Sequence, residues 1–110
     1  MTRALIVGPD RGLAAPLTDQ GIETVSVETP ASGEDLKAAG IADASLLFVT
    51  DGTEATLISV ATELNPDLRI VWYAPTSVPE FATRQLDLGV DPSLIDAATL
   101  VEEQLAAVEA

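Results

Sequence analysis

The sequence predicts an α/β domain of the Rossmann or flavodoxin-like type, a three-layer, doubly wound arrangement around a parallel five-stranded sheet. Apolar runs that suit strands buried on both faces alternate with segments of helical periodicity, and this alternation continues along all 110 residues. Because parallel crossovers are right-handed, few topologies are available to such a chain, and we expect the strand order 2-1-3-4-5. The length fits a single domain over residues 1–110.

Each element follows from its local pattern. The continuous apolar run 4–8 predicts a central strand, whereas the alternating run 22–28 predicts an edge strand with one solvated face. We expect helices to begin at acidic or hydroxyl capping residues and to end at glycine or proline. The predicted strands are 4–8, 22–28, 45–50, 69–74 and 93–97, and the fourth of them contains the core residues Trp72 and Tyr73. The first two predicted helices are 13–20, which ends at Gly21, and 34–39, which ends at Gly40. The other three begin at capping pairs: Asp51 and Glu54 start a helix at 53–64, Ser77 and Glu80 start one that ends at Gly89, and Thr99 and Glu102 start the last.

The chain is strongly acidic, with 18 Asp and Glu against 5 Lys and Arg and a net charge of −13. Such a surface repels the phosphates of nucleic acids and anionic membranes, so we expect neither as a partner. The acids are scattered and Lys37 is the one lysine, a composition typical of halophilic proteins; the alternative is an acidic face for a basic protein partner. No apolar run approaches the roughly 20 residues that span a bilayer, and the start runs directly into a strand without a signal peptide. We therefore expect a cytoplasmic protein without direct membrane insertion.

Little in the sequence suits catalysis. It contains no His and no Cys, and therefore neither a base that titrates near neutral pH nor a thiol nucleophile. The serine-hydrolase and Walker A patterns are also missing, so we expect no enzymatic activity. Asp10, Glu28 and Asp51 follow strands on one rim of the sheet and together could hold Mg²⁺. We favour the simpler interpretation, in which Asp10 and Asp51 cap helices and Glu28 is exposed, so no metal is expected.

The segment GPDRG follows the first strand and could cradle a phosphate at a helix N-terminus. Compared with the dinucleotide pattern Gly-x-Gly-x-x-Gly, Gly8 matches the first glycine, but Asp10 and Leu13 replace the other two. The carboxylate of Asp10 would repel a phosphate, Gly12 restores flexibility one position out of register, and Arg11 is the one base nearby. Interpretation as a plain strand-to-helix turn therefore stays open.

Further candidates lie at the ends of other strands. Glu28 follows Gly8 by 20 residues, the spacing at which dinucleotide domains place an acid against a ribose; alternatively it is only an exposed acid at a strand end. Thr50 and Asp51 follow the third strand, at the expected topological switch point, where ligands bind. The candidate cofactor-binding residues are Gly8, Asp10, Arg11, Gly12, Glu28, Thr50 and Asp51.

Two stretches, 36–74 and 81–96, resemble the N-terminal nucleotide-binding domain of the RCK, or TrkA-N, family, whose members regulate potassium channels and transporters. The run ELNPDLRIV, residues 63–71, is the most specific part, and the two stretches cover about half of the chain. The resemblance implies a Rossmann-like fold that binds NAD or an adenine nucleotide, with Glu28 in the place of the family's ribose acid. The glycine loop departs from the family pattern, and the family's third strand is missing; without that strand, the family's strand order becomes the five-strand order expected above.

Receiver domains of response regulators share this topology and provide another hypothesis. They carry a phospho-accepting Asp at the end of the third strand, where Asp51 lies, and a hydroxyl group after the fourth strand, where Thr76 and Ser77 lie. They also require an acidic pair after the first strand, of which Asp10 alone is present, and a lysine after the fifth strand, which this chain lacks. The match would thus be a pseudo-receiver.

From these observations we expect a stand-alone, non-catalytic regulatory domain of degenerate TrkA-N type, which senses a nucleotide weakly or acts through protein contacts. A pseudo-receiver centred on Asp51 and a pure protein-interaction module with an empty crevice are the alternatives. The partner would be another protein or a second copy of the chain, in a homodimer.

Overall fold

The computed structural model describes residues 2–109 and has the predicted α/β architecture. All five strands are parallel, and their order in the sheet is β2-β1-β3-β4-β5, which confirms the predicted fold class and topology. The elements are β1 (Arg3–Val7), α1 (Ala14–Asp19), β2 (Glu23–Val27), α2 (Gly33–Ala38), η1 (Ile41–Asp43), β3 (Leu46–Val49), η2 (Gly52–Glu54), α3 (Leu57–Leu64), β4 (Arg69–Tyr73), η3 (Glu80–Gln85), β5 (Leu88–Val90) and α4 (Ala97–Glu109), where η denotes a 3₁₀ helix.

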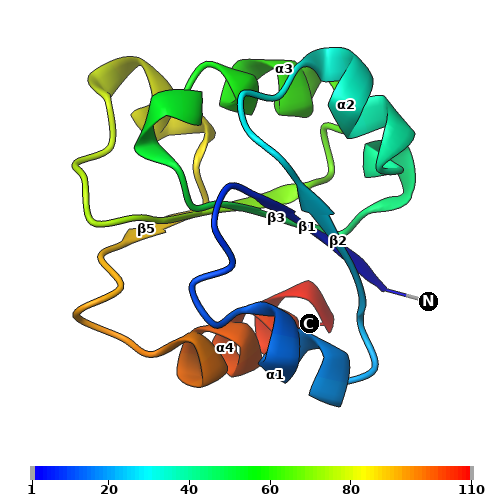
Figure 1. The fold of residues 1–110 in the computed structure, drawn as a ribbon, viewed down its shortest axis with the longest axis vertical. Coiled ribbons are helices and arrows are strands. Elements are labelled where there is room, and N and C mark those ends of the chain that lie inside the picture. The colour runs from blue at the N-terminus through cyan, green and yellow to red at the C-terminus, as the bar shows by residue number, and fades with distance from the viewer. Residues whose placement is uncertain (1, 110) are drawn as a thin grey trace.

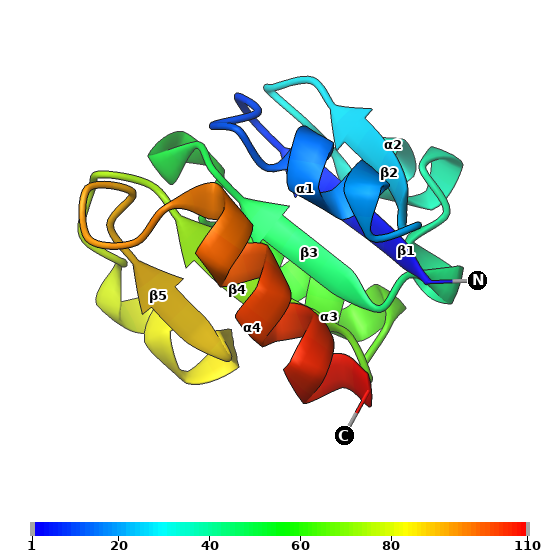
Figure 2. The same ribbon diagram turned by 90° about the horizontal axis from the view of Figure 1, so that it is seen from below.

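The sheet forms the middle of three layers. Helices α2 and α3 and the turn η3 cover one face, and α1 and α4 cover the other (Figure 1). Seen from the side of α1 and α4, β2 and β5 form the two outer edges (Figure 2). None of the described helices combines the length and the apolar character that crossing a membrane would require.

Alternate residues of each central strand fill two separate cores. In β1, Leu5 and Val7 pack under α2 and α3, whereas Ala4 and Ile6 pack over α1 and α4. All four side chains are fully buried, because helices cover both faces of the sheet. This double burial explains why the strand reads as one continuous apolar run.

Both aromatic residues of β4 are core residues, as predicted, and they point to opposite faces. Trp72 belongs to the core under α3, and its ring N–H donates to the carbonyl of Thr76 (3.0 Å). Tyr73 belongs to the other core, and its hydroxyl donates to the carbonyl of Ile95 (2.7 Å). Burial raises the pKa of Tyr73, with a smaller contribution from the negative charge of Asp96.

The predicted fifth strand at 93–97 is wrong. Strand β5 lies earlier, at Leu88–Val90, and Gly89 is part of it and does not end a helix. Leu88 and Val90 pack against the core of α1 and α4, whereas Leu94 is 82% exposed and therefore gains nothing from a strand there. Residues 93–96 are instead part of the loop that leads into α4, and Ala97 is the first residue of that helix.

Two predicted capping pairs are also wrong. The helix expected after Ser77 is the short turn η3, which starts after Pro79 and has no side-chain cap. Helix α4 starts at Ala97, and Asp96 caps it by accepting the backbone N–H of Thr99 (2.7 Å). Neither Ser77 nor Thr99 therefore acts as the predicted cap: the N-cap position of η3 is Pro79, two residues after Ser77 and without a side-chain cap, and the cap of α4 lies three residues before Thr99.

A buried amide explains part of the run ELNPDLRIV. The side-chain amide of Asn65 donates to the carbonyls of Ile41 and Ala44, both at 2.9 Å, and its oxygen accepts the N–H of Asp67 (3.1 Å). Asn65 thus ties the end of α3 to η1 and shapes the turn into β4. Since all of these partners are satisfied, the polar side chain is buried without an orphaned group.

Candidate functional site

Four loops meet at the carboxyl ends of the strands, where the order of the sheet reverses between β1 and β3. Gly8 lets the first and third of these loops touch, because a Cβ there would lie 2.6 Å from the hydroxyl oxygen of Thr50 and 2.9 Å from the backbone nitrogen of Asp51. Gly8 also has a φ of +114°, which side chains disfavour. Thr50 is buried, and its hydroxyl donates to the carbonyl of Pro9 (2.6 Å), which fixes the two loops to each other.

The β1–α1 loop is occupied by its own carboxylate. The two oxygens of Asp10 accept the backbone N–H groups of Gly12 (2.9 Å) and Ala14 (3.1 Å). These are the amides that a phosphate would use at the start of this helix, so Asp10 takes the place of the anion. Asp10 therefore caps the first turn, as the simpler interpretation expected, although it does so from three residues before Leu13, which holds the N-cap position of α1 without a side-chain hydrogen bond.

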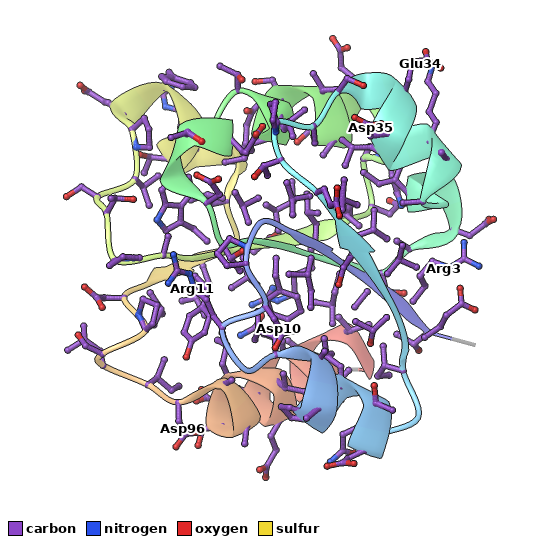
Figure 3. All side chains as sticks on the ribbon, viewed as in Figure 1. Arg3, Asp10, Arg11, Glu34, Asp35 and Asp96 are labelled. Carbon is purple, nitrogen blue, oxygen red and sulfur yellow. The ribbon has the colours of Figure 1, made fainter. Side chains whose placement is uncertain are left out.

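Arg11 points to a different side of the loop from Asp10 (Figure 3). Its φ of 50° is in the left-handed region, the one such value for a residue other than glycine within 2–109. Its Nε donates to the carbonyl of Thr50 (2.9 Å), so the guanidinium group lies across the end of β3. Arg11 also lines the crevice to which Asp51 contributes.

Asp51 is held by two hydroxyl groups. Its Oδ1 accepts both the backbone N–H (2.9 Å) and the hydroxyl (2.7 Å) of Thr53, and its Oδ2 accepts the hydroxyl of Thr29 (3.2 Å). The hydrogen bonds from Thr53 lower the pKa of Asp51, and Thr29 and the charge of Arg11 lower it further, while slight burial opposes them. Asp51 is a cap, as predicted, but of the 3₁₀ turn η2; the helix expected at 53–64 begins only at Leu57, as α3. The expected partner of Asp51, Glu54, is instead buried and accepts the N–H of Ala31 (3.3 Å).

A pocket of about 530 Å³ opens between these loops. Two prolines form its apolar walls, and its polar part consists of hydroxyl-bearing side chains and one side chain of each charge, Arg11 and Asp51. Its lining consists of Pro9, Arg11, Asp51, Gly52, Thr53, Pro75, Thr76 and Ser77. A Cβ on Gly52 would collide with the hydroxyl of Thr76, so the third and fourth loops also approach closely.

Glu28 lies apart from this pocket. It is exposed just beyond the end of β2 and lines a second pocket, of about 550 Å³, between the outer side of β2 and α2. Within residues 2–109 no three Asp or Glu side chains come close enough to hold a metal ion. The hypothesis of a magnesium site made by Asp10, Glu28 and Asp51 is therefore wrong.

The predicted site residues thus divide into three groups. Gly8, Thr50 and Asp51 meet as expected, with Arg11 beside them, whereas Asp10 and Gly12 form a closed turn and Glu28 lies elsewhere. Thr29 and Thr53, which hold the carboxylate of Asp51, are not among the predicted site residues. The signal for Thr29 was its place directly after the second strand, on the same rim as Asp51.

Solved structures confirm the fold. The orphan response regulator HP1043 of H. pylori matches with a TM-score of 0.75 at 16% identity, over 97% of this chain and 96% of that one. The TrkA-N domain of the inner membrane protein YbaL from Escherichia coli matches with a TM-score of 0.71 at 23% identity, over 92% of this chain and 95% of that one. The constitutive lysine decarboxylase of E. coli matches with a TM-score of 0.72 at 18% identity; 99% of this chain covers 17% of that enzyme. Identities this low show a shared fold and nothing more.

Sequence comparison places the chain more specifically. No curated protein matches it significantly. One family model, described as "Family of unknown function (DUF7126)", matches residues 4–104, which is nearly the whole chain. The chain therefore belongs to the DUF7126 family.

Proposed function

We propose that this chain is a non-catalytic regulatory domain that acts through protein contacts and binds no dinucleotide in its β1–α1 loop. The observation that carries the proposal is the carboxylate of Asp10, which already bonds the loop amides of Gly12 and Ala14. The fold resembles those of a response regulator and of a TrkA-N domain, and a regulatory role for this chain would be consistent with that resemblance.

The positions of the other candidates also support this proposal. A dinucleotide bound in the usual way would need phosphate at the loop and ribose at Glu28, but Glu28 lines a separate pocket beside β2. The one positive group at the loop, Arg11, is turned away from the amides and bonded to Thr50. The net charge of −13 further disfavours an anionic ligand and favours either a basic partner or a high-salt environment.

Titration by NMR tests the proposal directly. NAD, NADH, ATP and AMP are added in molar KCl to the wild type and to Asp10→Gly, while the amide signals of Gly12, Ala14 and Glu28 are followed. We expect no saturable shift at these amides in the wild type. A saturable shift there, weakened by Glu28→Gln, would overturn the proposal and restore the nucleotide sensor.

A pseudo-receiver is the second candidate, and one observation favours it. Asp51 follows β3 and lines the pocket together with the hydroxyl-bearing Thr76, as a phospho-accepting Asp would. Against it, the chain's one lysine, Lys37, lies on α2 and pairs with Glu34 (3.5 Å), and none follows β5. Both oxygens of Asp51 also accept hydrogen bonds already.

Beryllofluoride with Mg²⁺ separates the two candidates. Saturable shifts centred on Asp51, present in the wild type and lost in Asp51→Asn, would favour the pseudo-receiver. We expect no such response, because no pair of acids accompanies Asp51 and no metal site is formed by the described residues.

A further inference from the structure

The outer edge of β2 offers free backbone groups. The N–H of Glu23 donates to the carbonyl of Thr2 and the carbonyl of Val27 accepts from Gly8, so these odd-numbered residues point their backbone toward β1. Because backbone direction alternates along a strand, Thr24 and Ser26 point their N–H and carbonyl groups outward. No described strand pairs with this edge, since β2 ends the sheet (Figure 2).

The edge lacks the features by which most sheets block further pairing. Strand β2 contains neither lysine nor proline, and three of its five residues are β-branched. Its one charged residue, Glu23, forms an ion pair with Arg3. The other edge differs, because β5 has three residues and is flanked by Asp87 and Asp91. Acids also lie near the β2 edge, because Glu28 follows the strand and Asp35 lines the pocket beside it, but within the strand itself Glu23 is the one charged residue.

The side chains along β2 are self-complementary when the strand meets a copy of itself in antiparallel orientation. With Val25 opposite Val25, Thr24 faces Ser26 and Glu23 faces Val27, so no acid faces another acid. This register also places the outward-pointing Thr24 and Ser26 in a hydrogen-bonded pair, which antiparallel geometry requires. The pocket between β2 and α2 is lined by the apolar side chains of Val25, Ala38 and Ala39 as well as by the acids Glu28 and Asp35, and its volume leaves room for the facing valine.

We propose that two copies of this chain associate through their β2 strands, antiparallel about a two-fold axis at Val25, and so join their sheets. The contact is one of the protein contacts invoked in the proposed function, and it rests on that proposal only to this extent. An interface built on one strand pair falls at the small end of known interfaces, below about 1,200 Å², so association is weak and concentration-dependent. Because each copy carries −13, salt strengthens the association by screening.

Cysteine cross-linking tests the register, since the chain has no cysteine of its own. In the proposed dimer, Val25 faces its own copy in a non-hydrogen-bonded pair, where Cα atoms are about 4.5 Å apart, within the range for a disulfide. Under mild oxidation in molar KCl, Val25→Cys is expected to form a covalent dimer at least tenfold faster than the matched control Thr24→Cys. Equal rates for the two variants would overturn the proposed register.

Sedimentation velocity tests the contact without cross-linking. Ser26→Pro removes an outward N–H that β2 does not use within one copy, so the variant should fold with an unchanged circular dichroism spectrum and stay monomeric. The wild type should shift from monomer to dimer with rising concentration and with rising KCl. A wild type that is monomeric throughout, a Ser26→Pro dimer, or a dimer weakened by salt would overturn the proposal. None of these results would affect the nucleotide titration that tests the proposed function.

Discussion

Replacement of Asp10 by alanine removes the carboxylate that accepts the amides of Gly12 and Ala14 at 2.9 and 3.1 Å. Loss of such a capping side chain costs about 1 kcal/mol of unfolding free energy, with a range of about 0.5–2. Domains of this size unfold with an entropy of about 2.1 cal/mol/K per residue, so each kcal/mol shifts Tm by about 4 °C. We therefore expect Asp10→Ala to melt about 4 °C below the wild type.

The matched control is Asp10→Asn. It removes the same negative charge but keeps one of the two acceptor oxygens, which can accept one of the two amides. Since asparagine is otherwise a good helix cap, we expect its Tm to lie between those of the alanine variant and the wild type in thermal melts followed by circular dichroism. If the alanine and asparagine variants melt at the same temperature, the cap contributes nothing and the argument that Asp10 occupies the loop fails.

Four other predictions concern stability. Gly8→Ala should lower the unfolding free energy by at least about 2 kcal/mol, because the φ of Gly8 is +114° and the new Cβ would collide with Thr50. Gly21→Ala, at a φ of +77° but with open space around the new Cβ, should lower it by only about 1 kcal/mol. Equal losses for the two variants in urea melts would show that the close approach at Gly8 does not matter. Asn65→Ala should cost about 1–3 kcal/mol by leaving two buried carbonyls unpaired, and an Asn65→Ala variant as stable as the wild type in urea would contradict this. The hydrogen bonds from Thr53 hold the folded-state pKa of Asp51 below its ordinary value of 3.8. The ionised carboxylate therefore stabilises the fold above pH 3.8, and this contribution is lost as the pH falls through the lowered pKa. Asp51→Asn should be less stable than the wild type at pH 7, and the difference in stability should shrink in melts at acid pH. Finally, because 18 acids face 5 bases, the wild-type Tm should rise steadily from low salt to molar KCl, and a flat dependence would refute the halophilic interpretation.

The sequence predicted the sheet well because its central strands are buried on both faces. The runs ALIV in β1 and LLFV in β3 are apolar at every position, as expected for strands that helices cover on both faces. The order of the strands in the sheet follows from the handedness of the crossovers. Strand β5 was misplaced because only three residues form it, of which Leu88 and Val90 are half-buried and Gly89 is exposed. The apolar residues of 93–97 have a stronger strand pattern, although 93–96 is a loop and Ala97 begins α4. Short edge strands carry little burial and therefore little signal.

The site was predictable only in part. The placement of Asp51 at the switch point follows from strand order, and the capping role of Asp10 follows from its position before a helix. The isolation of Glu28 did not follow, because spacing along the chain does not say on which side of an edge strand a side chain falls. The hydroxyl of Thr29 was missed because hydrogen bonds between loops depend on distances that no local pattern encodes. Thr53, in contrast, follows Asp51 by two residues in the same turn, so its contact is of the local kind that an Asp in a turn commonly makes.

Asp10 makes folding and anion binding compete for the same two amides. The carboxylate is part of the chain, so it competes with an incoming phosphate at any protein concentration. Binding of the phosphate would also have to compensate for the free energy of the helix cap that is lost. The residue at this one position thereby determines whether the loop can bind an anion. We expect proteins of this fold that carry Gly or Ser at the place of Asp10 to have loop amides available to anions, and those that carry Asp there to use the crevice, if at all, for ligands without phosphate.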